Sequence, residues 1–181
     1  MNHLLQRFFA ICLLRAGPQD LPASRFLMVL CLGIYGGAGF LLSLGSLPWL
    51  GSLVLILVDT LLLVLISFLL LWMRALTERF TQVCTALAGT GIFFELLALP
   101  LLIWQQHSVG AFQQDGGNGL GIFISALVLW LCLFWNLIVI GHILRHALST
   151  LMPVGLALGV AYLFISISIS RQLTAFFVAS G

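Results

Sequence analysis

The sequence contains five apolar stretches that are each long enough to cross a lipid bilayer. A spanning helix needs ~20 predominantly apolar residues, and a strand with open edges would leave backbone groups unpaired in lipid. We therefore predict an all-α polytopic integral membrane bundle of five transmembrane helices within residues 25–181. The serine alternation at 166, 168 and 170 has a strand-like period, but the same argument favours a helix there. The predicted spans are residues 26–47, 50–73, 80–104, 120–143 and 151–178.

The composition excludes several classes of protein. Of the 181 residues, 62% are hydrophobic and 7% are charged, too few charges to cover a soluble domain. The net charge of +2 is too small for a nucleic-acid-binding surface. The four cysteines lie far apart with no CxxC or Cys/His cluster, so we expect no metal site, no cofactor and no redox motif. Lipid is the expected partner of most of the surface.

Residues 1–24 precede the first span and are too short in apolar length to cross the membrane. Their pattern predicts an amphipathic helix that lies at the membrane surface and ends at Gly17-Pro18, because proline restricts the residue before it. The apolar residues that recur at helical spacing are Leu4, Leu5, Phe8, Phe9 and Cys12.

The arginines predict the orientation of the bundle. Three precede the first span, two lie between the second and third, and one lies between the fourth and fifth, so six of seven share one side. Arginine-rich loops remain in the cytoplasm. We expect a bacterial cytoplasmic (inner) membrane location with a cytoplasmic N-terminus and an external C-terminus. The polar residues 105–119 are predicted to be the longest loop, on the outer side.

Two acidic residues lie inside predicted spans. Asp59 lies nine residues after Leu50, and Glu95 lies nine residues before Trp104. At ~1.5 Å per residue, both are about 13 Å from the outer boundary, near the middle of a ~30 Å hydrocarbon core. Arg171 lies at a similar depth if the last span continues to residue 178. If that span instead stops at Arg171, a short tail follows it on the surface.

A charge in the middle of a bilayer costs at least ~2.5 kcal/mol, so these groups need partners. We consider Asp59, Glu95 and Arg171 a candidate intramembrane polar cluster. It can serve as a solute site or proton relay, or as an ion-pair network that fixes helix packing; a third alternative is that the groups do not touch. A solute site requires a water-accessible cavity that reaches Asp59 or Glu95, whereas a packing role requires both to be enclosed by protein.

Other polar residues have simpler interpretations. Asn136 is expected to form an interhelical hydrogen bond. His142 and His146, spaced i and i+4, could offer two nitrogens to a metal, but no third ligand is evident, and histidines facing the cytoplasm at a helix end explain them better. No GxSxG, phosphate-binding glycine loop or HExxH occurs, so we predict that the protein is not an enzyme.

The third to fifth spans resemble a known family. The run RFTQVCTALAGTGIFFELLALPLL at 79–102 is similar to the third span of bacterial members of the Ypt-interacting protein (YIP) domain family. The run LFWNLIVIGHILRHALSTLMPVGLAL at 133–158 is similar to the junction of the family's fourth and fifth spans, with Trp135, Ser149 and Pro153 as matching positions. The resemblance implies a five-helix membrane protein with a cytoplasmic N-terminus.

Eukaryotic members of that family are linked to vesicle traffic and GTPase binding through a long N-terminal region with a DLYGP motif. Here that region has about 25 residues, and Asp20-Leu21-Pro22 matches only part of the motif. The resemblance thus implies a fold rather than GTPase binding. We expect a membrane-organising or partner-binding protein that uses the GxxxG faces Gly33/Gly37 and Gly155/Gly159 toward another membrane protein or a second copy. The alternative is a small transporter, channel or proton-coupled subunit built on the midplane acids.

Overall fold

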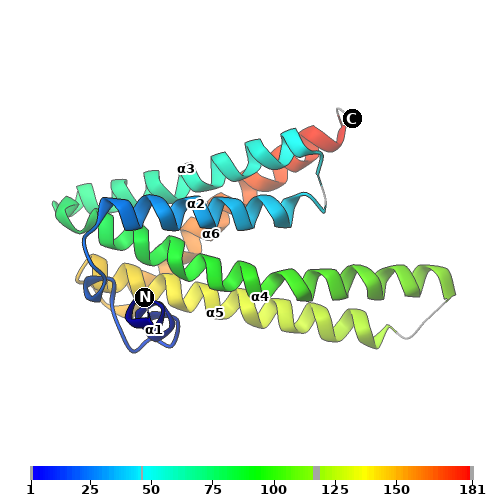
Figure 1. Ribbon diagram of the computed structural model, residues 1–181, viewed down its shortest axis with the longest axis horizontal. Helices are drawn as coiled ribbons and strands as arrows, with labels where there is room; N and C mark the ends of the chain where they lie inside the picture. The colour runs from blue at the N-terminus through cyan, green and yellow to red at the C-terminus, as the bar shows by residue number, and fades with distance from the viewer. Residues whose placement is uncertain (1, 46, 116–118, 180–181) are drawn as a thin grey trace.

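The computed structural model describes residues 2–45, 47–115 and 119–179, which form a bundle of long helices (Figure 1). The chain is 88% helical, and the described residues contain no strand, which confirms the predicted all-α class. The helices are α1 (Asn2–Cys12), α2 (Arg25–Ser43), α3 (Trp49–Met73), α4 (Phe80–Asp115), α5 (Leu120–Ala147) and α6 (Met152–Ala179), with 3₁₀ turns η1 (Pro18–Asp20) and η2 (Thr77–Arg79). Helices α2 to α6 are long and apolar enough to cross a membrane, so this is a multi-pass membrane protein.

Helix α4 is the centre of the bundle and packs against α1, α2, α3 and α5. Every residue from 83 to 90 is buried. This stretch reads VCTALAGT, and its small side chains let neighbouring helices approach from several directions, as is common in membrane interiors. Elsewhere the helices carry many exposed leucines, isoleucines and phenylalanines, which is the surface expected of a protein dissolved in lipid.

Glycines also hold α5 close to α6. A Cβ atom on Gly155 would collide with the carbonyl oxygen of Gly141 and would lie 2.9 Å from the backbone nitrogen of Arg145. Gly159, one turn later, would place a Cβ 3.3 Å from Leu137 and Ile140 side chains. The second GxxxG face is therefore an internal contact of the bundle. The first is not: a Cβ on Gly33 or Gly37 would meet nothing within 4 Å.

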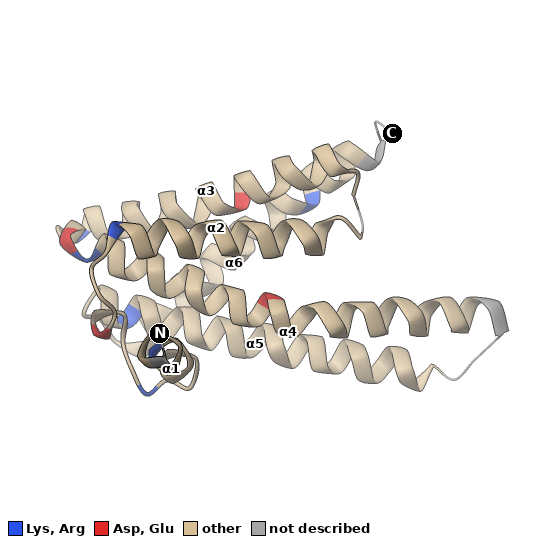
Figure 2. Ribbon diagram, viewed as in Figure 1, with Lys and Arg blue, Asp and Glu red and all other residues tan. Residues whose placement is uncertain are grey.

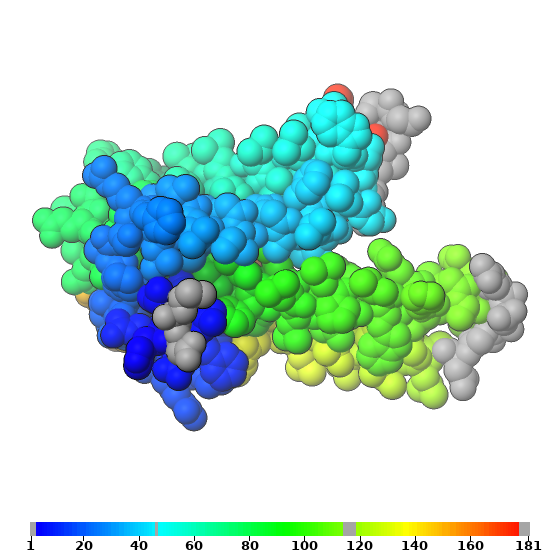
Figure 3. Space-filling model, viewed as in Figure 1, coloured from blue at the N-terminus to red at the C-terminus, as the bar shows by residue number. Residues whose placement is uncertain are grey.

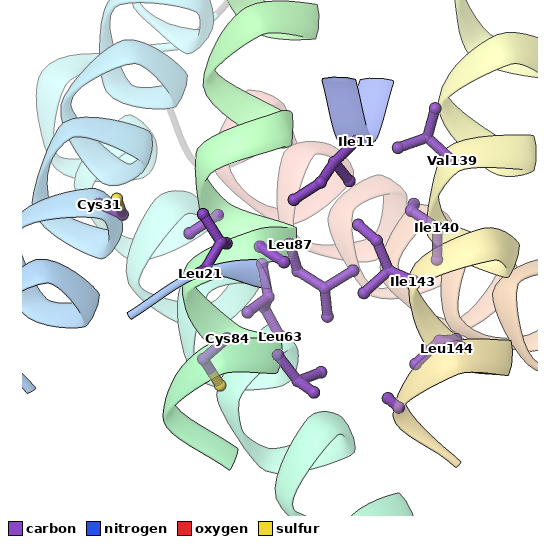
Figure 4. Packing of buried hydrophobic residues seen from close by; sticks show 14 of the residues in the cluster. Ile11, Leu21, Cys31, Leu63, Cys84, Leu87, Val139, Ile140, Ile143 and Leu144 are labelled. Carbon is purple, nitrogen blue, oxygen red and sulfur yellow. The ribbon is translucent and has the colours of Figure 1, made fainter. Parts of the chain in front are cut away.

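Helix α1 runs across the bundle at one end, where Figure 1 shows it nearly along its axis while the spans lie in the plane. The ring of Phe8 lies directly on Gly89 of α4, where a side chain would collide with it. Ile11 points between Leu87 of α4 and Ile143 of α5 (Figure 4) and is fully buried. The predicted amphipathic helix is present, but one of its faces belongs to the protein core, while Leu5 and Phe9 remain exposed.

Hydrogen bonds fix the segment between α1 and α2 to the spans. Trp135 Nε1 donates to the carbonyl of Cys12 at 3.0 Å, and His142 Nε2 donates to the carbonyl of Ala16 at 3.0 Å. From α4, Gln82 Nε2 donates to the carbonyl of Leu21 at 2.8 Å. These donors pair with carbonyls at the last residue of α1 or beyond it, where no further helical turn supplies an N–H.

Three helices end in the same unusual way at this end of the bundle. Leu14, Ala75 and Ser149 follow α1, α3 and α5 with positive φ of 61°, 54° and 52°. In each case the next residue donates its N–H to a carbonyl five residues earlier, as in the Schellman motif. Glycine usually occupies this position because a Cβ costs ~1–2 kcal/mol in the left-handed region. The tight turns return the chain directly toward the next element.

The predicted loop at 105–119 is wrong up to Asp115, because α4 continues as a helix through Pro100 to that residue. Residues 116–118 lie outside the described residues. A 36-residue helix is ~54 Å long, well beyond the ~30 Å hydrocarbon core. Its polar last turns extend with the start of α5 past the other spans (Figure 1), and a Cβ on Gly121 of α5 would lie 3.0 Å from Ser108 Oγ of α4. Polarity in this stretch therefore indicates a water-exposed helical hairpin rather than a loop.

Charged residues gather at the end where α1 lies (Figure 2), which we call the arginine-rich end. It holds the segments between α1 and α2, between α3 and α4, and between α5 and α6. The opposite end holds the α2–α3 and α4–α5 connections and the C-terminus (Figure 1). Acidic positions also lie midway along α3 and α4 (Figure 2), far from both ends. All arginines except Arg171 lie in α1, in these connecting segments or in the helical turns next to them.

Candidate functional site: a central polar cavity

Asp59 on α3 accepts hydrogen bonds from two other spans inside the bundle. The hydroxyl of Tyr35 on α2 donates to its Oδ2 at 2.5 Å, and the hydroxyl of Ser166 on α6 donates to its Oδ1 at 2.6 Å. Both distances are short, as expected for hydroxyl donors on a carboxylate. Three spans therefore converge on one carboxyl group, and each of its oxygens has a donor.

Glu95 on α4 has a different environment. Its Oε2 is buried and has no hydrogen-bond partner among the described residues. Its Oε1 lies beside Gly39 of α2, where a Cβ would be 3.1 Å from it. A carboxyl oxygen that is buried without a donor is costly, and a proton or a cation on the group reduces that cost. Glu95 thus has a carboxyl oxygen that is available to bind a proton or a cation.

Both acids line one cavity of about 310 Å³, which we call the central cavity. Every one of α2 to α6 contributes to its wall. The space-filling view shows a cleft between α2 and α4 that widens away from the arginine-rich end (Figure 3). The polar side chains in the wall are Tyr35, Asp59, Thr90, Glu95, Cys132, Asn136, Tyr162 and Ser166. The sequence-based expectation that Asp59 and Glu95 lie in one layer matches this placement.

The structure does not bring Arg171 into this group. Arg171 is exposed, does not line the central cavity, and forms no ion pair with either acid in the described part of the chain. The reason is helix geometry: Arg171 follows Ser166 by five residues, which places it about 140° around α6 from the face that meets Asp59. Helix α6 nevertheless continues past Arg171 to Ala179, so the chain does not leave the helix at this arginine.

Asn136 of α5 lines the central cavity, and its amide forms no hydrogen bond to another residue in the ranges described. The predicted interhelical bond is therefore not seen there. A side-chain amide offers two donors and an acceptor oxygen. Asn136 accordingly presents unused polar groups to the same space as Glu95, and both can contact a solute in the cavity.

The two tyrosines were not singled out from the sequence, although a signal was available. The chain has only two, Tyr35 and Tyr162, and both lie in the middle of spans rather than at the membrane boundaries where tyrosine is usually enriched. Both line the central cavity. The ring of Tyr35 lies against Gly91 of α4, where a Cβ would be 2.8 Å from it. The ring can occupy this position because Gly91 has no side chain.

His142 and His146 are separate from the cavity. Their ring centroids lie 4.6 Å apart at the arginine-rich end of α5. His142 is buried and its Nε2 is used by the carbonyl of Ala16, while Nε2 of His146 accepts from Arg145 at 3.2 Å. Within the described ranges, no group of three or more histidine, cysteine or acidic side chains is placed to hold a metal ion.

Comparisons with known proteins identify no relative with a similar site. No protein-family model matches the chain, no curated protein matches it, and no solved structure matches it.

Proposed function

We propose that the central cavity is a binding site through which a proton or a small cation moves within the membrane, so that the protein acts as a small transporter or proton-coupled membrane subunit. The observation that carries this proposal is that two carboxyl groups from different spans, Asp59 and Glu95, share one cavity while Glu95 Oε2 has no donor. A protein that used the acids only for packing would enclose both in hydrogen bonds.

The chemistry of the wall supports a cationic occupant. Two carboxyl groups in a low-dielectric space repel each other when both are ionised, and a proton or cation relieves that repulsion. Tyr35, Tyr162 and Asn136 supply oxygen atoms around them, and hard cations prefer oxygen ligands. The wall holds no arginine to neutralise the acids. The site is therefore suited to cations and to protons rather than to anions.

The setting of this function belongs to the same proposal. We place the protein in a bacterial cytoplasmic membrane, as a non-enzymatic YIP-type bundle with a cytoplasmic N-terminus and an external C-terminus. Six arginines at one end support the orientation. Reporter fusions at residues 76 and 115 test it: the first should report the cytoplasm and the second the outside. The reverse pattern contradicts the orientation.

Water access to the cavity can be tested with Cys132, which lines its wall. In a variant with Cys12, Cys31 and Cys84 replaced by alanine, a charged methanethiosulfonate reagent should modify Cys132, because thiolates form only where water reaches. The matched control is Leu131→Cys combined with Cys132→Ala, since Leu131 is 59% exposed on the bundle surface next to lipid. Equal resistance of both thiols would contradict a hydrated cavity.

Ion movement is the direct test. Purified protein in liposomes containing a pH-sensitive dye should carry protons or a monovalent cation down an imposed gradient. Asp59→Asn and Glu95→Gln should each reduce the rate at least tenfold, because each removes a group that holds the cation. Ser166→Ala should reduce it less, and Ser168→Ala, which changes a serine outside the cavity wall, should not change it. Wild-type liposomes that leak no faster than empty ones overturn the proposal.

A second candidate function, partner binding, is favoured by a separate observation. The Gly33/Gly37 face of α2 is open, and a shallow groove formed by Phe26, Val29, Leu30, Gly33 and Ile34 runs along it. Such faces pair closely with another helix. A second copy of this chain is the partner to test. Cysteine cross-linking through Ile34→Cys in membranes should give dimers that Gly37→Leu abolishes; cross-links that persist in Gly37→Leu contradict this face.

A further inference from the structure

The second large cavity of the molecule lies at the arginine-rich end and has no part in the central site. It has a volume of about 570 Å³ and opens between the start of α4, the end of α5 and the start of α6. We call it the arginine-end pocket. Its wall consists of Gln19, Arg79, Arg145, His146, Ser149, Thr150, Leu151 and Met152. Polar groups make up most of this list, although the surrounding helices are mainly apolar.

Two arginines from different elements give the pocket its positive charge. Arg79 ends η2 and Arg145 lies in the last turns of α5. Neither forms an ion pair with a carboxylate in the part of the chain that the structure describes. Asp20 interacts electrostatically with His146, and its Oδ2 accepts from the Gly17 N–H at 2.8 Å; Glu78 is the residue before Arg79 in η2. Both guanidinium groups therefore remain outside ion-pair distance of a carboxylate among the described residues.

Hydrogen bonds hold both guanidinium groups in place without using all their donors. Arg79 Nη1 donates to the carbonyl of Ala147 at 3.3 Å and to Ser149 Oγ at 3.1 Å. The first of these bonds supplies a donor to a carbonyl at the carboxyl end of α5. Arg145 Nη2 donates to His146 Nε2 at 3.2 Å. A guanidinium has five N–H donors, so each arginine keeps several for another acceptor. A fixed arginine with free donors suits the tetrahedral oxygens of a phosphate.

A hydroxyl group and a helix end complete the site. Thr150 Oγ1 is buried and lacks a hydrogen-bond partner among the described residues, although the side chain lies in the pocket wall. Two residues further on, α6 begins at Met152, which lines the same wall. Pro153 has no N–H, and the N–H groups of Val154 and Gly155 already donate to the carbonyl of Leu151, so the Met152 N–H is the donor at this helix end. The amino end of a helix carries partial positive charge and attracts anions. An acceptor oxygen in the pocket would pair with the Thr150 hydroxyl and the Met152 N–H together.

We propose that the arginine-end pocket binds a phosphate-type anion through Arg79, Arg145, the Thr150 hydroxyl and the Met152 N–H at the amino end of α6. The anion can be the phosphodiester of an acidic lipid headgroup or a phosphate on a soluble molecule. Leu151 borders the pocket and is 74% exposed, which provides an apolar surface beside the anion for an acyl chain. This inference is independent of the function proposed for the central cavity.

The test uses the full chain in nanodiscs and in neutral detergent. Titration with phosphatidylglycerol, with phosphatidylcholine as the neutral comparison, should show saturable binding of the acidic lipid by native mass spectrometry. Arg145→Gln should weaken it about tenfold, because a charge-assisted bond is lost. Thr150→Val, which keeps the shape and removes the hydroxyl, should weaken it severalfold. Arg74→Gln, an exposed arginine outside the pocket wall, should change it less than twofold.

The arms of the experiment separate the two sources of phosphate. Saturable binding of phosphatidylglycerol but not of inorganic phosphate identifies a lipid headgroup. Binding of inorganic phosphate in detergent that is lost in the same variants identifies a soluble ligand, and either result supports the site. Equal losses in Arg145→Gln and Arg74→Gln, with no effect of Thr150→Val, would show general attraction to a basic surface and overturn it. If Arg145→Gln does not fold, Thr150→Val alone decides, and unchanged binding in that variant rejects the proposal.

Discussion

The hydroxyl of Tyr35 on α2 lies 2.5 Å from Oδ2 of Asp59 on α3 and donates a hydrogen bond to it. This bond joins two neighbouring spans midway along their length, in the wall of the central cavity. It depends on a third helix as well, because the ring of Tyr35 rests against Gly91 of α4. One side chain therefore links the polar centre of the bundle to the small-residue surface of its central helix.

Removing this donor should weaken the bundle by a modest amount. Tyr35→Phe keeps the ring and loses the hydroxyl, and we expect the free energy of unfolding to fall by about 1 kcal/mol, in the range of hydrogen bonds inside membrane proteins. Equilibrium unfolding in mixed detergent micelles measures it. In an Asp59→Ala background the same change should cost much less, because its acceptor is gone. Equal costs in both backgrounds would show that the ring position, rather than the bond, matters.

An alanine substitution should destabilise the protein at one GxxxG face and not at the other. Gly155→Ala places a methyl group against the Gly141 carbonyl, so α5 and α6 must separate, at a cost of about 1–3 kcal/mol or more. Gly33→Ala meets nothing within 4 Å, and alanine favours a helix over glycine. Thermal unfolding in detergent should therefore show a clear loss for the first variant and none for the second. Similar melting temperatures for both would contradict the internal packing of α5 on α6.

Docking of α1 can be followed through Cys12. Burial raises the pKa of the Cys12 thiol from 9.0 to about 11. Only the thiolate reacts, so below pH 9 the docked thiol should be alkylated about 100-fold more slowly than a thiol of ordinary pKa. Gly89→Leu removes the space for Phe8 and should release α1, with a large rise in the alkylation rate of Cys12.

The background for this experiment has Cys31, Cys84 and Cys132 replaced by alanine, so that one thiol remains. Gly37→Leu is the matched control, since a Cβ there meets nothing within 4 Å and the residue lies on a different surface. Fast alkylation of Cys12 in the single-cysteine protein that keeps Gly89 would mean that α1 does not stay docked. Both outcomes are read from the rate at one fixed pH.

The left-handed residue after α3 offers a route to higher stability. Ala75 has φ of 54°, a conformation that costs a residue with a Cβ ~1–2 kcal/mol, whereas glycine adopts it freely. Part of this gain is lost to the greater freedom of glycine in the unfolded chain, so Ala75→Gly should stabilise by about 0.5–1 kcal/mol. Ala161→Gly, at an exposed position inside α6, should destabilise by about 1 kcal/mol. A loss of stability in Ala75→Gly would refute the argument.

Much of the fold could be predicted because lipid imposes a simple rule on a chain. Every backbone group inside a bilayer must be paired, so an apolar stretch of sufficient length forms a helix whatever its neighbours do. Outside the bilayer that rule does not apply, so polarity alone does not distinguish a loop from a helix. The prediction of a loop at 105–115 is wrong for this reason, because these residues extend α4. The alternation of serines in α6 was correctly overruled by the same rule.

The site was only partly predictable. Depth along a helix follows from residue counting, which placed Asp59 and Glu95 in one layer. Direction around a helix does not follow without knowing which face meets the neighbours, and Arg171 was grouped with the acids for its depth alone. Ser166 gives no signal as a partner of Asp59, because serine is common in spans. Tyr35 is marked by its unusual position in the middle of a span, but that position does not indicate which residue it contacts before the helices are arranged.

The sequence by itself determined the solvent of this protein, the number of its spans and the layer that holds its acids, because these depend on hydrophobicity and length along one helix at a time. Only the tertiary structure decided which glycine pair lies inside the bundle, that Phe8 of α1 rests on Gly89 of α4, and that Glu95 faces a cavity while Asp59 receives two donors. These features depend on the rotation of each helix about its axis. That rotation is set by close packing of side chains from several helices, which no single stretch of sequence contains.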